Sequence, residues 1–274
     1  MAIPVTVIIF TKNEEMNISE CIMSVKSFSE IVVVDSGSVD KTKEIAESLG
    51  VRFINFDWNG KYPKKRQWTL DNIEFNNDWI LFLDADERVT DDLKTEIANF
   101  LEICSGDFSA GSIALKYYFA GSELKFGQKP RKTVLLKLGS ASFPEINDLN
   151  AKGMGELEGH YQPTVIGKIQ KFESKIIHRD LDPVSTWMTR HIGYANWEAH
   201  LILNKEAKFQ VNKSKGVLGS YVHRLPFRPF TFFIYTYILK FGFLDGRAGF
   251  DYAFAKSWYY WLSNLIAREA KSHD

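Results

Sequence analysis

The sequence has little cysteine and no net charge. Its 274 residues include two cysteines, Cys21 and Cys104, too few for a disulfide framework or a cysteine-rich zinc site, so a reducing compartment is expected. The 34 basic residues are balanced by 34 acidic ones, which argues against a nucleic-acid-binding protein. No basic leader or cleavage site precedes the first apolar run, and we expect that run to be a strand.

Long apolar segments are also missing. The tail FRPFTFFIYTYILKFGF contains a 14-residue stretch interrupted by Lys240, which is too short to span a bilayer. Residues 226–261 nevertheless hold 15 of the 39 aromatic residues. Such a segment belongs either to the core or to a surface where aromatic and basic side chains meet lipid headgroups. We expect a C-terminal helical subregion over 206–274.

Strand-like and helix-like patterns alternate in the first part of the chain. Runs rich in Ile and Val predict strands at 3–10, 30–35, 51–56 and 79–84. Apolar spacing and end signals predict helices at 17–27, 40–50, 63–73 and 91–103. This alternation predicts an α/β fold with a mostly parallel sheet and flanking helices, which binds ligands at the carboxyl ends of its strands.

After residue 110 the pattern changes to shorter segments. We expect strands at 112–119, 133–138, 157–161 and 174–178, followed by a helix at 184–204. The chain is therefore divided into a first half over 1–110, a second half of the same domain over 111–205, and the helical subregion.

Polar clusters follow three of the predicted strands, at Thr11–Glu14, Asp35–Ser38 and Asp84–Asp86. The ends of parallel strands share one edge of a sheet, so these clusters should meet. The two carboxylates of Asp84-Ala85-Asp86 can share one Mg²⁺ or Mn²⁺ ion, which completes its shell with substrate phosphates. An acidic turn that caps the next helix is the alternative. The position at a strand end of an α/β unit favours the metal site.

The other clusters suit a nucleoside diphosphate. The Asp35 carboxylate can accept hydrogen bonds from a base or a ribose, or it can serve only the turn, where we assign helix capping to Asp40. Either Thr11 or Glu14 can contact the nucleoside. In GKYPKKRQW, Arg66 can supply fork-shaped countercharge to a diphosphate, although basic residues at a surface often face only water.

The segments VIIFTKNEE, EIVVVDSGSVDKT, WILFLDADERV and FGFLDGRAGF together resemble family 2 inverting glycosyltransferases of GT-A fold, a Rossmann-like nucleotide-sugar-binding fold. More narrowly, they resemble the bacterial lipopolysaccharide-core β-glucosyltransferase branch. The resemblance implies that the first half binds a UDP-sugar donor, with Mg²⁺ or Mn²⁺ between Asp84-Ala85-Asp86 and the diphosphate. It implies that the second half binds a lipid-linked saccharide acceptor.

The same resemblance bears on location and on the aromatic tail. It implies a cytoplasmic enzyme, peripheral on the cytoplasmic face of the inner membrane. A lipid-anchored acceptor favours the interfacial interpretation of residues 226–261 over the core interpretation. One departure concerns Lys65-Arg66-Gln67, where relatives often have a Gln-Lys/Arg-Asn run.

An inverting transfer needs a base that deprotonates the acceptor hydroxyl. The segment GMGELEGHYQP offers Glu156, Glu158 and His160, which point the same way if the segment is extended. Ordinary polar residues of an exposed strand are the alternative. The resemblance implies an acidic base in this region, where the family's usual His-Glu pair is not reproduced; we rank Glu158 first, Glu156 second and His160 third. It also implies a metal ligand at His178, for which a structural histidine is the alternative.

Other functions share parts of this pattern. A polyprenyl-phosphate glycosyltransferase would use the same donor chemistry with another acceptor. A nucleotidyltransferase would carry a Gly-rich basic loop after the first strand, where this chain has TKNEE. A non-enzymatic membrane scaffold is compatible with the aromatic tail alone.

Overall fold

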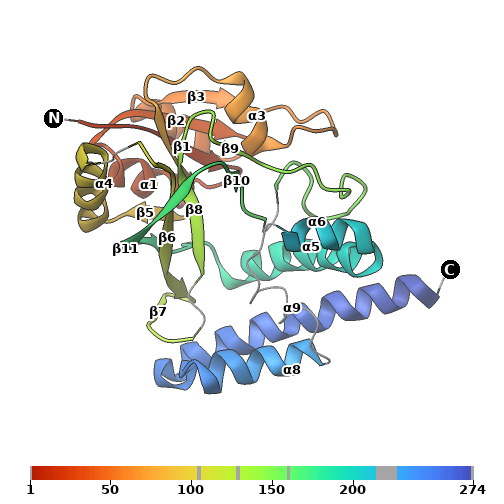
Figure 1. Cartoon of the computed structure of the whole chain (residues 1–274). Helices are drawn as coiled ribbons and strands as arrows, with labels where there is room; N and C mark the ends of the chain where they lie inside the picture. Colours follow the sequence, from red (N-terminus) through yellow and green to blue (C-terminus); the bar gives the residue numbers. More distant parts are fainter. Residues whose placement is uncertain (1, 104–105, 128–129, 159–160, 214–226, 273–274) are drawn as a thin grey trace.

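The computed structural model describes residues 2–103, 106–127, 130–158, 161–213 and 227–272. Its centre is a nine-stranded sheet in the order β3-β2-β1-β4-β8-β6-β11-β5, with β7 paired to β6 (Figure 1). The strands of this sheet are β1 (Ile3–Thr11), β2 (Phe28–Asp35), β3 (Arg52–Asn55), β4 (Trp79–Asp84), β5 (Glu87–Val89), β6 (Phe108–Phe119), β7 (Ser122–Leu124), β8 (Arg131–Lys137) and β11 (Lys168–His178). A small separate sheet pairs β9 (Ala141–Ser142) with β10 (Thr164–Val165).

The first four strands are parallel and are connected by helices. These helices are α1 (Ile18–Ser24), α2 (Thr42–Ser48) and α3 (Lys65–Asn72), and α4 (Asp91–Ile103) follows β5. β1 is buried along its length except at Pro4, because α1 and α4 pack against it, so its sequence shows no polar alternation. The predicted α/β fold class is confirmed.

The second half of the chain extends the same sheet. β8 runs antiparallel to both β4 and β6, and β11 runs parallel to β6. The end of β11 pairs with the short strand β5, which places His178 opposite Glu87, the residue that follows Asp86. The helix predicted at 184–204 is α5 (Val184–Leu203), which leads into α6 (Lys205–Lys213).

The prediction of a strand at 157–161 is wrong for residues 157, 158 and 161, which are the described part of this range. Residues 152–157 form turns, while 159–160 lie outside the described residues. Gly153 and Gly155 have φ of 100° and 50°, conformations that glycine adopts without strain. A Cβ on Gly153 would lie 1.9 Å from the backbone oxygen of Gly193, so the turn packs directly on α5.

A buried ion pair joins this loop to the start of α3. Lys64 Nζ lies 2.9 Å from Asp148 Oδ1, with side chains 1% and 0% exposed. Asp148 also accepts hydrogen bonds from the Tyr62 hydroxyl and from Trp197 Nε1 of α5. Buried charges are tolerated when they are paired and hydrogen-bonded. The network therefore fixes the N-terminus of α3 relative to α5.

The C-terminal residues are helical, as predicted, and the structure shows that they form a hairpin. α8 (Arg228–Phe233) continues into the π-helical turn η1 (Ile234–Leu239), and the chain reverses through η2 (Gly242–Asp245) into α9 (Gly246–Ser272). α9 packs against both α5 and α8 (Figure 1). None of the described helices is long and apolar enough to cross a membrane.

The buried network predicts a large cost for Asp148→Asn. The substitution leaves the Lys64 ammonium buried without a counterion, which should lower the free energy of unfolding by about 3–5 kcal/mol in urea denaturation. Glu47→Gln is the control, because it removes the Lys43–Glu47 pair, whose side chains are 53% and 55% exposed. That pair should contribute less than about 0.5 kcal/mol. Equal losses in the two variants would contradict the role of Asp148.

Candidate active site

The carboxyl ends of three parallel strands meet at one edge of the sheet. β1 is in register with β2 and β4, so Thr11 lies beside Asp35 and Phe10 lies beside Asp84. The N–H of Ala85 donates to the oxygen of Phe10, which continues the ladder past the end of β4. The structure therefore brings the predicted nucleoside and metal residues to one rim, as a parallel sheet should.

Asp84 lies between two cations. Arg66 of α3 donates from Nη2 to Asp84 Oδ1 at 3.0 Å, and Lys132 of β8 donates from Nζ to Oδ2 at 2.6 Å. Lys132 also binds Glu87 Oε1 at 2.6 Å. Burial opposes the ionisation of Asp84, but Lys132 and Arg66 outweigh it and hold the pKa of this carboxyl well below its usual range. Both Asp84 oxygens are thus bound by protein donors.

Asp86 and His178 form a second pair with a different character. His178 Nδ1 lies 3.6 Å from Asp86 Oδ2, beyond hydrogen-bonding distance. That nitrogen and Asp86 Oδ1 are both buried and have no hydrogen-bond partner among the residues that the structure describes. Buried polar atoms normally have partners, so this pair fits a divalent cation bound by carboxylate and imidazole.

The protein supplies few preformed metal ligands. Within the described ranges, no group of three or more His, Cys, Asp or Glu residues is arranged to hold a metal ion. Mg²⁺ and Mn²⁺ sites often use one or two protein ligands and take the remaining ligands from water and substrate phosphates. The Asp86–His178 pair is compatible with that pattern, and the predicted metal role of Asp84 stays a prediction.

The turn after β2 uses Asp35 within the protein. Asp35 is 2% exposed, and its carboxylate accepts hydrogen bonds from the N–H and the hydroxyl of Ser38. Asp40, one residue before the N-cap Lys41, accepts the N–H of Thr42 at the start of α2. The neighbouring Thr11 Oγ1 is buried and unpartnered within the described part of the chain. The nucleoside roles of Asp35 and Thr11 stay predictions, and the unpartnered hydroxyl fits a ligand contact.

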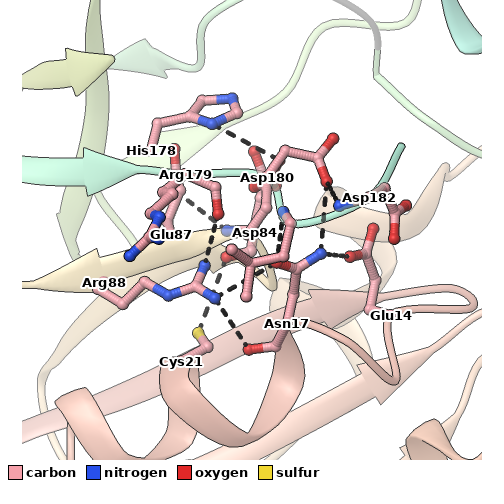
Figure 2. Close-up of polar contacts among 12 residues, drawn as sticks. Glu14, Asn17, Cys21, Asp84, Glu87, Arg88, His178, Arg179, Asp180 and Asp182 are labelled. Atoms are coloured by element: carbon pink, nitrogen blue, oxygen red, sulfur yellow. Dashed lines mark hydrogen bonds and ion pairs between the residues drawn. The ribbon is translucent and has the colours of Figure 1, made fainter. Parts of the chain in front are cut away.

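Glu14 belongs to a charged cluster shared with the second half of the chain. Asn17 donates to Glu14 at 2.8 Å and to Asp180 at 3.5 Å, and Figure 2 shows it between these two acids. Arg190 of α5 lies 3.4 Å from Glu14 and also binds Asp180. Burial, reinforced by the charge of Asp86, raises the pKa of Glu14 to about 8. Its predicted contact with the nucleoside stays a prediction.

Glu158 caps a helix. Its Oε1 accepts the backbone N–H groups of Arg66 at 2.6 Å and Gln67 at 3.0 Å, at the N-terminus of α3, where a carboxylate is favourable. The side chain is buried, and burial raises its pKa. Glu158 also lines a cavity of about 280 Å³ with Tyr62 and Phe143. These contacts add a capping role, and the base role stays a prediction.

The other two base candidates are placed differently. Glu156 Oε1 lies 3.6 Å from Lys12 Nζ, and its backbone oxygen accepts the N–H of Lys65. Because residues 152–157 form turns, the common direction predicted from an extended strand is wrong for Glu156 and Glu158. His160 lies outside the described residues.

Several charged residues at the rim are absent from the sequence prediction. Lys65 donates to the oxygen of Thr11 at 2.8 Å, and burial lowers its pKa to about 8. The others are Lys132, Asp180, Asp182 and Arg190, of which Arg190 lies 3.2 Å from Asp182. The RDLD sequence after β11 is a strand-end polar cluster like those of the first half and could have been found by the same rule. No comparable signal marks Lys132 or Arg190.

The raised pKa of Glu14 predicts a pH-dependent stability. The pKa of Glu14 is about 8 in the folded protein, whereas the ordinary pKa of a free glutamate side chain is 4.5. The folded state therefore binds more protons between these values, so its stabilisation is complete below pH 4.5 and is lost as the pH rises towards 8. Glu14→Gln should remove this loss in metal-free protein.

The measurement is the free energy of unfolding from urea titrations at pH 5 and pH 8, with the exposed neighbour Glu15→Gln as control. The gap between wild type and Glu14→Gln should change by on the order of 1 kcal/mol or more between the two pH values. If the difference in free energy of unfolding between wild type and Glu14→Gln does not depend on pH, the pKa of Glu14 is not raised by folding.

Comparison with known proteins agrees with this geometry. Residues 6–125 match the Glycosyl transferase family 2 model. An uncharacterized glycosyltransferase of Rickettsia bellii is 43% identical over 94 residues, which are 34% of this chain and 31% of that protein. One of Rickettsia typhi is 28% identical over 209 residues, covering 75% of this chain and 70% of that protein. The lipopolysaccharide core biosynthesis glycosyltransferase LpsC of Rhizobium meliloti is 32% identical over 124 residues, or 43% of this chain and 44% of LpsC.

Several relatives are thus matched over less than half of their own length. Among solved structures, S. aureus TarS 1–349 aligns with 100% of this chain and 92% of its own, at 14% identity and a TM-score of 0.42. Residues 6–125 carry the parallel strands β1 to β4 and the polar rim at their ends. This part of the chain, residues 6–125, is a glycosyl transferase family 2 domain.

Proposed function

We propose that the protein is a metal-dependent inverting glycosyltransferase that moves a hexose, expected to be glucose, from a UDP-sugar to a glycolipid acceptor such as lipopolysaccharide core. The observation that carries this proposal is the unpartnered Asp86–His178 pair beside the Arg66–Asp84–Lys132 cluster, at the strand ends of a family 2 domain. The name of the Rhizobium relative, LpsC, supports the lipopolysaccharide-core acceptor.

The donor would lie across the rim. Thr11 and Asp35 follow adjacent strands and would contact the nucleoside, with Glu14 at its border. Arg66 and Lys132 carry the positive charge that a diphosphate needs, and Arg66 can present it in fork geometry. Asp84 holds these two cations in place, which orients them before the donor arrives. A preorganised cationic site stabilises charge that develops on a leaving group.

Asp86 and His178 would hold the Mg²⁺ or Mn²⁺ ion. When bound, such an ion supplies Lewis-acid stabilisation of the departing diphosphate. The chain itself provides the carboxylate and imidazole ligands, and His178 Nδ1 lies 3.6 Å from Asp86 Oδ2. Asp86 Oδ1 and His178 Nδ1 are buried and have no hydrogen-bond partner among the described residues. The coordination shell of the ion needs no further protein ligand, because phosphate oxygens and water can complete it.

The acceptor hydroxyl needs a base on the side opposite the departing diphosphate. Glu158 remains our candidate because burial raises its pKa towards that of an effective general base and because it lines a cavity. Glu156 ranks second. The proposed enzyme works in the cytoplasm, peripheral on the cytoplasmic face of the inner membrane, because its acceptor is lipid-linked. A polyprenyl-phosphate acceptor is the second candidate, and an acceptor panel with one UDP-sugar separates the two.

The metal role predicts the behaviour of Asp86→Ala. A thermal-shift titration with UDP and Mn²⁺ should stabilise wild type, since a ligand that binds only the folded state raises its stability. Asp86→Ala should lose this shift and the transfer activity, because His178 alone cannot hold the ion. Asp91→Ala, at a side chain that is 95% exposed on α4, is the matched control and should behave as wild type. Full activity in Asp86→Ala would refute the metal role.

The base role predicts the behaviour of Glu158→Gln. Glutamine keeps the shape and can still accept the N–H bonds of the α3 cap, but it cannot take a proton. Transfer should fall on the order of 10²–10⁴-fold while the UDP–Mn²⁺ thermal shift is retained. Glu156→Gln, two positions away, should lose less than about tenfold. If Glu158→Gln stays active, Glu158 is a cap alone; if Glu156→Gln is the inactive variant, Glu156 is the base.

A further inference from the structure

The C-terminal hairpin carries a continuous cluster of aromatic rings on its surface. Phe233 contacts Tyr237 and Phe250, Tyr237 contacts Phe243 and Phe250, and ring contacts continue from Phe243 to Phe241 and from Phe250 to Phe254. We call these six residues the aromatic face. Four of them are exposed: Phe241 by 56%, Phe243 by 43%, Phe250 by 43% and Phe254 by 59%. Contiguous exposed apolar surface of this kind marks an interaction site.

The aromatic face is separate from the surface that holds the hairpin on the domain. α9 packs on α5 and α8, with Tyr252, Ala253 and Tyr259 buried along it. Phe232 of α8 is also buried and contacts the ring of Tyr260, so an interfacial role for this residue is excluded. The hairpin therefore has its own core, and the exposed rings are not required to complete it.

A second segment of the chain adds to the tip of the hairpin. The loop after β7 is held there because both oxygens of Asp245 accept backbone N–H groups, from Lys125 and from Phe126. The N–H of Gly127 donates to the oxygen of Lys240. Phe126 is 39% exposed, and the lysines at 125 and 240 are exposed as well. Aromatic and basic side chains from two distant parts of the sequence thus share one surface.

The charges at this surface favour an anionic partner. Asp245 is engaged by the two backbone N–H groups, and Asp251 pairs with Arg247 at 3.7 Å. Lys125 and Lys240 are both exposed, and the Lys240 ammonium lies 5.5 Å from the centre of the Tyr235 ring. Exposed aromatic rings with lysines beside them are side chains that enter the headgroup region of a bilayer. A second copy of this chain at the same surface would instead bring the lysines of the two copies together.

We propose that the aromatic face docks the protein on the surface of an anionic lipid bilayer, with Phe241 and Phe254 inserted at the headgroup level and Lys125 and Lys240 on the phosphates. This inference rests on the proposed lipid-linked acceptor for its biological purpose and names the surface that would meet that lipid.

The test is co-sedimentation of the full chain with vesicles, without donor, metal or acceptor. Wild type should bind vesicles of phosphatidylcholine with phosphatidylglycerol and should bind pure phosphatidylcholine more weakly. The double variant Phe241→Ser/Phe254→Ser should lose at least about tenfold in partitioning, from the apolar area no longer buried. Phe209→Ser is the control, because this ring on α6 is 70% exposed but outside the aromatic face, and it should bind like wild type.

A charge variant tests the second part of the proposal independently. Lys125→Gln/Lys240→Gln should weaken binding to the anionic vesicles by about fivefold per lysine and leave binding to the neutral vesicles unchanged. Both residues are exposed, so this variant should keep the wild-type melting temperature. Retention of the UDP–Mn²⁺ thermal shift in all variants would show that the donor site is intact, which separates membrane docking from the proposed catalysis.

Three results would overturn the proposal. Failure of wild type to sediment with anionic vesicles excludes a bilayer at this surface. Binding of the aromatic variant that equals wild type excludes it as well. The third result is a dimer of wild type in sedimentation equilibrium and a monomer of the Phe241→Ser/Phe254→Ser variant. This result would assign the aromatic face to a second copy of the chain.

Discussion

The charge pairing around Asp84 is the constraint on which the rest of the candidate site depends. Three elements meet there: β4 supplies Asp84, α3 supplies Arg66, and β8 supplies Lys132. The Asp84 side chain is 35% exposed, and its pairs with Arg66 and Lys132 join the three elements at this partly buried edge. Lys132 also neutralises Glu87, which is fully buried at the start of β5. The acidic cluster after β4 is therefore compatible with folding before any ligand binds.

The two aspartates of the D-x-D sequence have different partners in the structure. Because Asp84 is occupied by Arg66 and Lys132, the atoms left without partners are on Asp86 and His178. His178 reaches this position because β11 pairs with β5, the strand that begins directly after Asp86. The family 2 domain contributes the carboxylates, and the second half of the chain contributes the histidine and the lysine. A complete site thus requires both halves of one sheet.

The second half also determines how the donor rim is supported. The Lys64–Asp148 pair fixes the start of α3. Glu158, further along the same loop as Asp148, caps this helix. Movement of the loop over 146–158 would therefore move Arg66, which lies in the first turn of α3 and binds Asp84. On the opposite side, the C-terminal hairpin packs on α5, whose Arg190 reaches Glu14. The surface proposed to meet lipid is thus connected to the rim through packed helices.

The sequence by itself determined the parallel first half, because apolar runs that alternate with helical spacing leave few other folds, and it placed Thr11, Asp35 and Asp84 at one edge. It also predicted the long helix at α5 and an aromatic helical tail. Only the tertiary structure decided which polar groups pair. Lys132 reaches Asp84 through an antiparallel pairing between distant strands, and Glu158 follows a turn in which Gly153 packs against α5. Local periodicity reports which residues are buried, whereas ion pairs and caps depend on contacts between segments far apart in the chain, which no local pattern records.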